Sequence, residues 1–183
     1  MTPSTRGAHR PSVLISAASK HGATAEIASH IGELLGNRDL DVTVASPEQV
    51  GSVEGYDAVV LGSAVYAGTW QKEAKELAER VAAREPSPLV WLFSSGPVGD
   101  PPKPDEDPQD AAGVVEATSP REHRVFAGKI DKERLSFGER MIMTALRAPE
   151  GDFRDWEEIS SWAVDIADIL EAERQAPDVA REH

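Results

Sequence analysis

The chain has 183 residues, with 32 acidic and 19 basic side chains and a formal net charge of −13. It contains no cysteine, so a disulfide framework, a thiolate metal site and a cysteine nucleophile are excluded, and the composition fits a reducing cytoplasm. The acidic balance argues against a nucleic-acid partner, which needs a basic face, and leaves either a merely soluble surface or one that docks a basic partner.

The N-terminal half predicts strands and helices in alternation. Residues 1–11 are polar and predict a flexible arm, with no apolar core behind it that would make a signal peptide. Short apolar runs predict buried strands; these are VLISAA (13–18), DVTVA (41–45), DAVVLGSAV (57–65) and PLVWLFSS (88–95). Helical spacing predicts two helices between them; their apolar faces are Ile27, Ile31, Leu34 and Leu35, and Trp70, Ala74, Leu77, Ala78 and Val81.

The C-terminal half starts with a Gly- and Pro-rich loop after the fourth strand. The elements predicted after it are a helix at 109–117, a strand at 123–128, and helices at 132–147 and 156–170. Residues 173–183 predict a flexible C-terminal tail. No apolar run approaches the ~20 residues that a membrane-spanning helix needs, so no transmembrane segment is expected.

Strands that alternate with helices and are apolar throughout predict a parallel sheet covered on both faces. The sequence therefore predicts one α/β domain over residues 12–172, a doubly wound five-stranded parallel sheet, with an extra helical segment near 128–150. Ligands of such sheets bind outside the carboxyl ends of the strands, where the strand order reverses. The loops after the first, third and fourth strands are therefore the candidate sites.

The loop SKHGAT (19–24) joins the first predicted strand to the first helix. Gly22 allows a tight turn, Ser19 and Thr24 carry hydroxyl donors, and a helix start presents free backbone N–H groups. These features suit a phosphate, although neither a P-loop nor a dinucleotide fingerprint is present. The alternative is a polar turn in which Thr24 caps the helix.

Two further loops carry related chemistry. After the third strand, Ser63 and Ala64 keep the backbone accessible, and Tyr66 is expected to contact a flat ligand. Trp70, at a predicted helix start, is expected in the core. After the fourth strand, SSGPVGD (94–100) again offers hydroxyls and backbone groups. Three successive strand ends of this kind favour a ligand site.

The order of elements and these loops resemble the flavodoxin-like family, which binds FMN. The family's phosphate loop reads T/S-x-T-G-x-T, and this chain has S-K-H-G-A-T, with His21 in place of a hydroxyl residue. Within the family, the chain is most similar to menaquinone-dependent protoporphyrinogen oxidase and related flavodoxin-domain proteins over about residues 12–172. That similarity is carried by ASKHGAT, LGSAVYAGTW, RVFAGKIDKERLSFGERM and EGDFRDWEEISSWA.

The resemblance implies the strand order 2-1-3-4-5 and three groups of FMN-binding residues. The phosphate would be held by Ser19, Lys20, His21, Gly22, Ala23 and Thr24. The two sides of the flavin ring would be lined by Ser63, Ala64, Val65, Tyr66, Ala67 and Gly68, and by Ser94, Ser95, Gly96, Pro97 and Gly99. Flavin carries the redox chemistry itself, so no catalytic residue is assigned. The histidines have no ligand spacing, so no metal site is expected.

Three functions remain open. One is an FMN-dependent oxidoreductase of haem biosynthesis that oxidises protoporphyrinogen with a quinone acceptor. Another is a carrier of electrons between protein partners, and the third is a flavin-free module that binds a partner. In the oxidoreductase, the segment 128–150 would cover an apolar substrate or meet a membrane surface, and Arg134, Arg140 and Arg147 would pair with substrate carboxylates. Otherwise this segment is an extra helix packed on the core.

Overall fold

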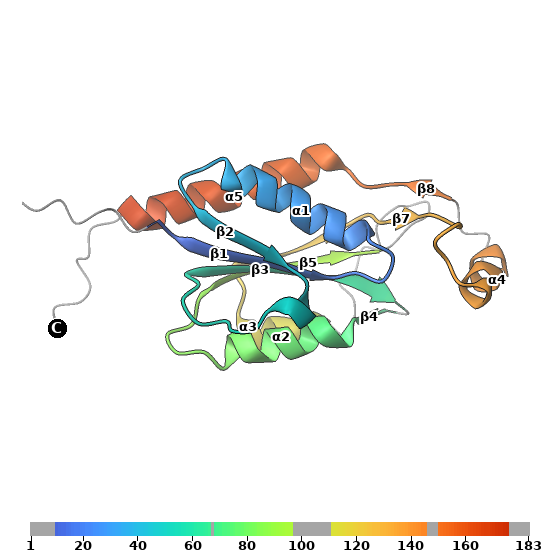
Figure 1. The fold of residues 1–183 in the computed structure, drawn as a ribbon, viewed down its shortest axis with the longest axis horizontal. Helices are drawn as coiled ribbons and strands as arrows, with labels where there is room; N and C mark the ends of the chain where they lie inside the picture. Colours follow the sequence, from blue (N-terminus) through green and yellow to red (C-terminus); the bar gives the residue numbers. More distant parts are fainter. Residues whose placement is uncertain (1–9, 67, 97–110, 146–149, 176–183) are drawn as a thin grey trace, which may run out of the picture.

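A parallel five-stranded sheet forms the centre of the protein, as Figure 1 shows for this computed structural model, which describes residues 10–66, 68–96, 111–145 and 150–175. The parallel strands are β1 (Ser12–Ala18), β2 (Asp41–Ala45), β3 (Ala58–Tyr66), β5 (Leu89–Ser95) and β6 (Glu122–Phe126). They lie in the order β2-β1-β3-β5-β6, and all four pairings are parallel. The predicted doubly wound sheet and its strand order are confirmed.

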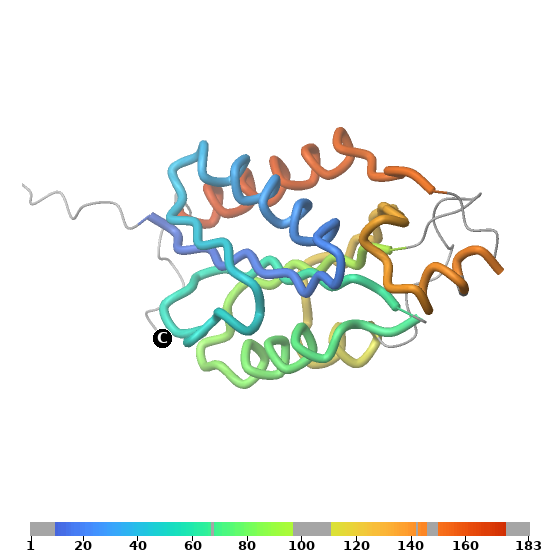
Figure 2. The backbone as a smooth tube through the Cα atoms, turned by 45° about the vertical axis from the view of Figure 1, so that its right-hand side comes forward, coloured from blue at the N-terminus to red at the C-terminus, as the bar shows by residue number. Residues whose placement is uncertain are grey.

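Helices cover both faces of the sheet, and Figure 2 shows the resulting layers from a second direction. Helices α1 (Ala23–Gly36) and α5 (Trp156–Gln175) pack on one face, and α2 (Lys72–Ala82) and α3 (Ala111–Thr118) pack on the other. A 3-10 turn (Pro47–Gln49) follows β2. Helix α5 continues to Gln175, past residue 172, where we expected the domain to end.

The unbroken apolar runs of the strands are explained by the two layers of helices. Successive side chains of a strand point to opposite faces of the sheet. In β1, Val13 and Ile15 pack in the core beneath α1 and α5, whereas Leu14 packs in the core beneath α2 and α3. The rings of Phe93, Phe126 and Trp162 meet beneath α1 and α5, with centroids 5.4 to 6.1 Å apart.

The prediction that Trp70 begins a helix was wrong. Trp70 lies in β4 (Thr69–Trp70), a short strand antiparallel to the end of β3, and α2 begins only at Lys72. Its side chain is nonetheless buried, and Nε1 donates a hydrogen bond to Ser94 Oγ at 2.8 Å. The helical spacing was continued one turn too far because Trp70 packs on the same core as the helix.

The predicted helix at 132–147 is shorter than expected. Helix α4 spans Phe137–Ala145, and the residues before it include β7 (Lys129–Ile130), which pairs antiparallel with β8 (Gly151–Asp152). This two-stranded sheet and α4 lie beyond the carboxyl ends of the main strands (Figure 1). No helix in the described ranges is long and apolar enough to cross a membrane.

Candidate functional site

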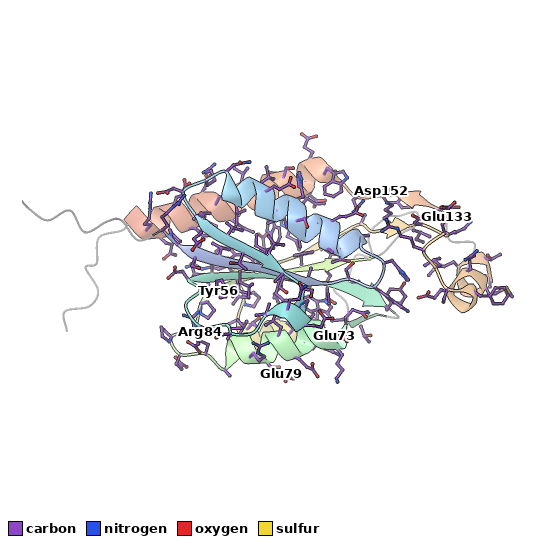
Figure 3. The ribbon with its side chains drawn as sticks, in the orientation of Figure 1. Tyr56, Glu73, Glu79, Arg84, Glu133 and Asp152 are labelled. Atoms are coloured by element: carbon purple, nitrogen blue, oxygen red, sulfur yellow. The ribbon has the colours of Figure 1, made fainter. Side chains whose placement is uncertain are left out.

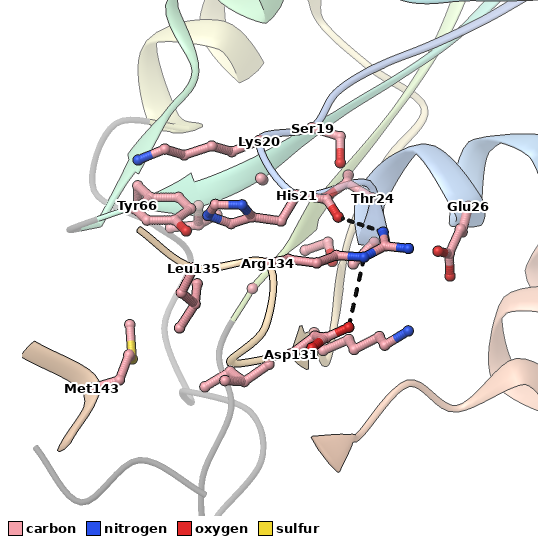
Figure 4. A pocket seen from close by; sticks show the side chains of 18 residues that line it. Ser19, Lys20, His21, Thr24, Glu26, Tyr66, Asp131, Arg134, Leu135 and Met143 are labelled. Carbon is pink, nitrogen blue, oxygen red and sulfur yellow. Dashed lines mark hydrogen bonds and ion pairs between the residues drawn. The ribbon is translucent and has the colours of Figure 1, made fainter. Parts of the chain in front are cut away.

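A cleft opens at the carboxyl ends of β1, β3 and β5, and the segment of β7 and α4 forms its far wall (Figure 4). It encloses about 860 Å3, counting the space that is open to solvent. The predicted site residues that line it are Ser19, Lys20, His21, Ala23, Thr24, Ala64, Val65, Tyr66, Ser95 and Gly96. The three strand-end loops therefore meet at one place.

The other predicted site residues lie outside the cleft wall. Ser63 and Ser94 are fully buried and are occupied by internal hydrogen bonds: Ser63 Oγ accepts the Gln71 N–H at 2.8 Å, and Ser94 Oγ accepts the Trp70 Nε1–H. Gly22 and Gly68 lie in turns with positive φ, and Gly68 is exposed. Ala67, Pro97 and Gly99 lie outside the described residues.

The loop after β1 turns at Gly22, whose φ of 91° is left-handed and favours glycine. Gly22 is the residue that precedes α1, and its N–H donates to Ser19 Oγ at 3.0 Å, but no side-chain hydrogen bond caps the helix. Thr24 is buried in the first helical turn and is not the cap, so the alternative reading of this loop as a Thr24-capped turn was wrong. A helix start without a capping side chain leaves backbone N–H groups for an anion.

Arg154 holds the start of α1 from the other side. Its Nη1 donates to Ala23 O at 3.0 Å and contacts Glu26 Oε2 at 2.8 Å, while Nη2 contacts Asp152 Oδ2 at 2.6 Å. The guanidinium also lies 4.5 Å from the centre of the Trp156 ring. Only 2% of this side chain is exposed. Hydrogen bonds from Arg154 lower the pKa of Asp152, and those partners raise the pKa of Arg154.

Glu139 ties α4 to the same loop. Its Oε1 lies 2.5 Å from Lys20 Nζ and 3.2 Å from His21 Nε2, while Oε2 accepts hydrogen bonds from Ser136 N and Oγ at 2.8 and 2.7 Å. Ser136 and Glu139 thus form a capping box at the start of α4. The hydrogen bond from Lys20 is the main reason that the pKa of Glu139 lies well below its usual range. Arg134 Nη1 adds a hydrogen bond to His21 O at 3.0 Å.

Neither Arg154 nor Glu139 was assigned a role from the sequence. Both lie in segments that carry the family resemblance, EGDFRDWEEISSWA and KIDKERLSFGERM, but the partners that they hold are far away in the chain. A local signal did exist for Glu139, because S-x-x-E before an apolar stretch is the pattern of a capping box. Of the other segment arginines, Arg134 lines the cleft, Arg140 donates to Leu135 O at 3.1 Å, and Arg147 lies outside the described residues.

Tyr66 lies in the cleft close to the side chains of Lys20 and His21 (Figure 4). The Lys20 ammonium lies 4.6 Å from the centre of its ring, and the His21 ring is 6.0 Å away. Partial burial, followed by the negative charge of Glu139, raises the pKa of Tyr66 to about 12. The phenol therefore stays neutral at physiological pH.

The chain matches the family model described as flavodoxin domain over residues 14–157. It belongs to the flavodoxin domain family. No curated protein sequence matches the chain.

Solved structures with this flavodoxin fold agree with that assignment. A flavodoxin from the domain Archaea superimposes with a TM-score of 0.58 at 16% identity, covering 87% of this chain and 99% of that chain. The rubredoxin oxygen:oxidoreductase of Desulfovibrio gigas gives a TM-score of 0.62 at 14% identity, and the match covers 91% of this chain but 38% of that one. A mutant form of the flavodoxin from Pseudomonas aeruginosa gives 0.54 at 13% identity, with 87% and 99% covered. At these identities the matches establish the fold, and the finer likeness to protoporphyrinogen oxidase stays a proposal.

Within this flavodoxin domain, Tyr66 is expected to ionise at a higher pH than an ordinary tyrosine. Spectrophotometric titration of the ligand-free protein should show a tyrosine that ionises near pH 12, and Tyr66→Phe should remove that transition. In the unfolded chain a tyrosine ionises near pH 10. The unfolded state therefore loses its proton first, and this group's contribution to stability falls as the pH rises from about 10 to 12.

Glu139→Gln provides the control for the cause of this shift. It should lower the Tyr66 pKa toward 10 without restoring it fully, because burial is the larger cause and remains. A transition near pH 12 that survives Tyr66→Phe would contradict its assignment to Tyr66.

Proposed function

We propose that this flavodoxin-domain protein binds FMN and carries electrons between redox proteins. The main support for this proposal is the SKHGAT loop. It turns at Gly22 into the start of α1, which has no side-chain cap, and it borders a cleft at the ends of three strands. Such a site accepts a phosphate at the helix and a flat ring in the cleft. When bound, FMN supplies the redox chemistry.

The residues of the cleft fit that cofactor. Backbone N–H groups of the first turn of α1, with the hydroxyls of Ser19 and Thr24, would hold the phosphate, and Lys20 adds a positive charge. The ring would lie by Tyr66 and Val65. Gly128 allows its segment to lie close against the backbone of Gly96 in the cleft wall, since a Cβ there would lie 3.0 Å from the Cα of Gly96.

Electron carriage implies a protein partner, and the net charge of −13 supports a basic one. Encounter between oppositely charged proteins is fastest at low ionic strength, because salt screens their attraction over about 10 Å at 0.1 M. A cytoplasmic location and a reductase as electron donor belong to the same proposal. Electron exchange that slows steadily as salt is added would support it.

Phosphate recognition is tested by comparing FMN with riboflavin, which lacks the phosphate. Thr24→Val should weaken FMN binding about tenfold or more, because a hydrogen bond to a charged group contributes roughly 1.5–3 kcal/mol. Riboflavin binding should change little. The measurement is a fluorescence titration of ligand-free protein with each flavin.

Ser29→Ala, an exposed change on the same helix, is the control and should leave both affinities unchanged. If Thr24→Val weakens both flavins equally, it has damaged the helix start and the phosphate assignment is wrong. If the unaltered protein retains neither flavin, FMN binding itself is rejected, and the flavin-free binding module becomes the better account.

A second candidate is an FMN-dependent oxidase that passes electrons from protoporphyrinogen to a quinone. It is favoured by one observation: Leu135 and Met143 bring apolar side chains from the α4 segment into the cleft, where Arg134 adds a positive charge. Phe137 and Met141 are 80% and 60% exposed on α4 and would supply a peripheral membrane contact.

The assay for this second candidate is protoporphyrinogen oxidation by the FMN-loaded protein with a quinone acceptor. An oxidase should show turnover that Met143→Ala reduces while FMN occupancy stays full. A carrier should show no such turnover, yet exchange electrons with a reductase protein.

A further inference from the structure

The carboxylate of Glu139 contacts two side chains of the proposed phosphate loop, the ammonium of Lys20 and the imidazole of His21. Lys20 and His21 both approach Oε1, and Glu139 is mostly buried, with 15% of its side chain exposed. These two residues directly precede Gly22, the residue before the start of α1. An anion carried by the protein itself therefore binds where the proposed function requires an anionic ligand.

A phosphate ester is the stronger competitor for these groups. It carries a charge of about −1.5 to −2 at pH 7 and offers three acceptor oxygens, whereas a carboxylate carries −1 and offers two. At equal distance, the phosphate therefore attracts an ammonium more strongly than a carboxylate does, and it repels a neighbouring carboxylate. A phosphate at the loop and Glu139 on Lys20 are thus mutually unfavourable.

We propose that Glu139 is an internal competitor for the phosphate-binding side chains of the loop, so that binding of a phosphate ester frees Lys20 and detaches α4 from the loop. The inference deepens the proposed FMN function, on which it rests for the identity of the ester. The α4 segment would thus respond to the phosphate of the ligand, whether or not it contacts the flavin ring.

The two oxygens of Glu139 have separate tasks, which makes the detachment selective. Lys20 and His21 use Oε1, whereas Ser136 uses Oε2 to complete the capping box. Loss of the Lys20 contact therefore leaves the start of α4 capped and the helix intact. Because Leu135 and Met143 line the cleft from either side of Glu139 in the chain, displacement of α4 widens the cleft at its apolar wall (Figure 4).

Glu139→Gln separates the charge from the cap, since glutamine also completes a capping box. With the competing charge removed, FMN should bind about tenfold more tightly, the order expected for one charge-assisted hydrogen bond. Riboflavin affinity should stay within about twofold. Glu133→Gln is the matched control, because Glu133 is an exposed carboxylate of the same segment (Figure 3) and the change removes the same formal charge. It should leave FMN affinity unchanged.

Hydrogen exchange of residues 137–145 gives a readout that does not depend on activity. In the unaltered protein, FMN should speed exchange in this segment and riboflavin should not. In Glu139→Gln, exchange should be fast already and insensitive to FMN. Any of three results would overturn the proposal. FMN binding could weaken in Glu139→Gln, or it could tighten equally in Glu133→Gln. In the unaltered protein, FMN could leave hydrogen exchange of residues 137–145 unchanged or make it slower.

The proposed function and this inference fail in different ways. If the unaltered protein binds neither flavin, the FMN proposal is rejected, and the same exchange experiment with inorganic phosphate decides the inference. Faster exchange at 137–145 with phosphate, absent in Glu139→Gln, would uphold it, and unchanged exchange would reject it. If FMN binds but the Glu139→Gln effect is missing, only the inference is rejected.

Discussion

Replacing Arg154 with methionine is expected to lower the free energy of unfolding by about 3 kcal/mol, because it removes one partner of a buried ion pair. The guanidinium is 2% exposed and contacts Glu26, Asp152 and the carbonyl of Ala23. The cost falls at the lower end of the usual ~3–5 kcal/mol because the two carboxylates keep partial access to water. Urea unfolding followed by circular dichroism measures it.

Arg121→Ala is the control for Arg154→Met. Arg121 pairs with Glu173 at 2.5 Å, but about half of each side chain is exposed, so the loss should be only about 0–1 kcal/mol. The Asp152 pKa is lowered in the folded protein, so its contribution is present above the unfolded pKa of about 3.9 and is lost as the pH falls through the folded value. The difference between the unaltered protein and Arg154→Met should therefore shrink in acid. Equal losses for both arginines would contradict the burial argument.

Replacing Trp162 with alanine is expected to lower the free energy of unfolding by about 3–5 kcal/mol, the range for truncating a large buried aromatic. Trp162 is 1% exposed and meets the rings of Phe93 and Phe126 edge-on, at 6.1 and 5.4 Å. Its removal would leave a cavity between the sheet and α5. Thermal and urea unfolding would both record the loss.

Trp162→Phe separates packing from hydrogen bonding. It keeps a ring against the aromatic group and loses the 2.7 Å bond from Nε1 to Glu122 Oε2. Glu122 retains a 2.6 Å contact with Arg124, so its charge is not left without a partner. The loss should be about 1.5 kcal/mol or less. If phenylalanine costs as much as alanine, the hydrogen bond and not the packing is the main contribution.

The main sheet was predictable because its physical signal is local. A strand covered on both faces is a nearly continuous apolar run, and β1 was expected at 13–18 and observed at Ser12–Ala18. The α4 segment was not predictable in the same way. Leu135 is buried in a non-helical stretch, whereas Phe137 and Met141 are exposed on the helix. Apolar spacing cannot distinguish residues that face the core from residues that face a cleft or solvent.

The position of the candidate site followed from topology, but its supporting contacts did not. Parallel strands end at one edge of a sheet, so the loops after β1, β3 and β5 had to converge. The contact from Glu139 to His21 joins residues 118 positions apart, and the bond from Arg154 to Ala23 joins residues 131 apart. No spacing within one element encodes such pairs. The sequence alone therefore located the loop without showing what holds it.

The bond between Arg154 and the start of α1 has a consequence for the order of events on the ribosome. Ala23 is synthesised 131 residues before the arginine that holds it. At about 5–20 residues per second, the SKHGAT loop waits on the order of ten seconds for this partner. A nascent chain stalled before residue 154 should thus lack the contacts that hold the SKHGAT loop, and binding of the proposed FMN belongs to the period after α5 emerges.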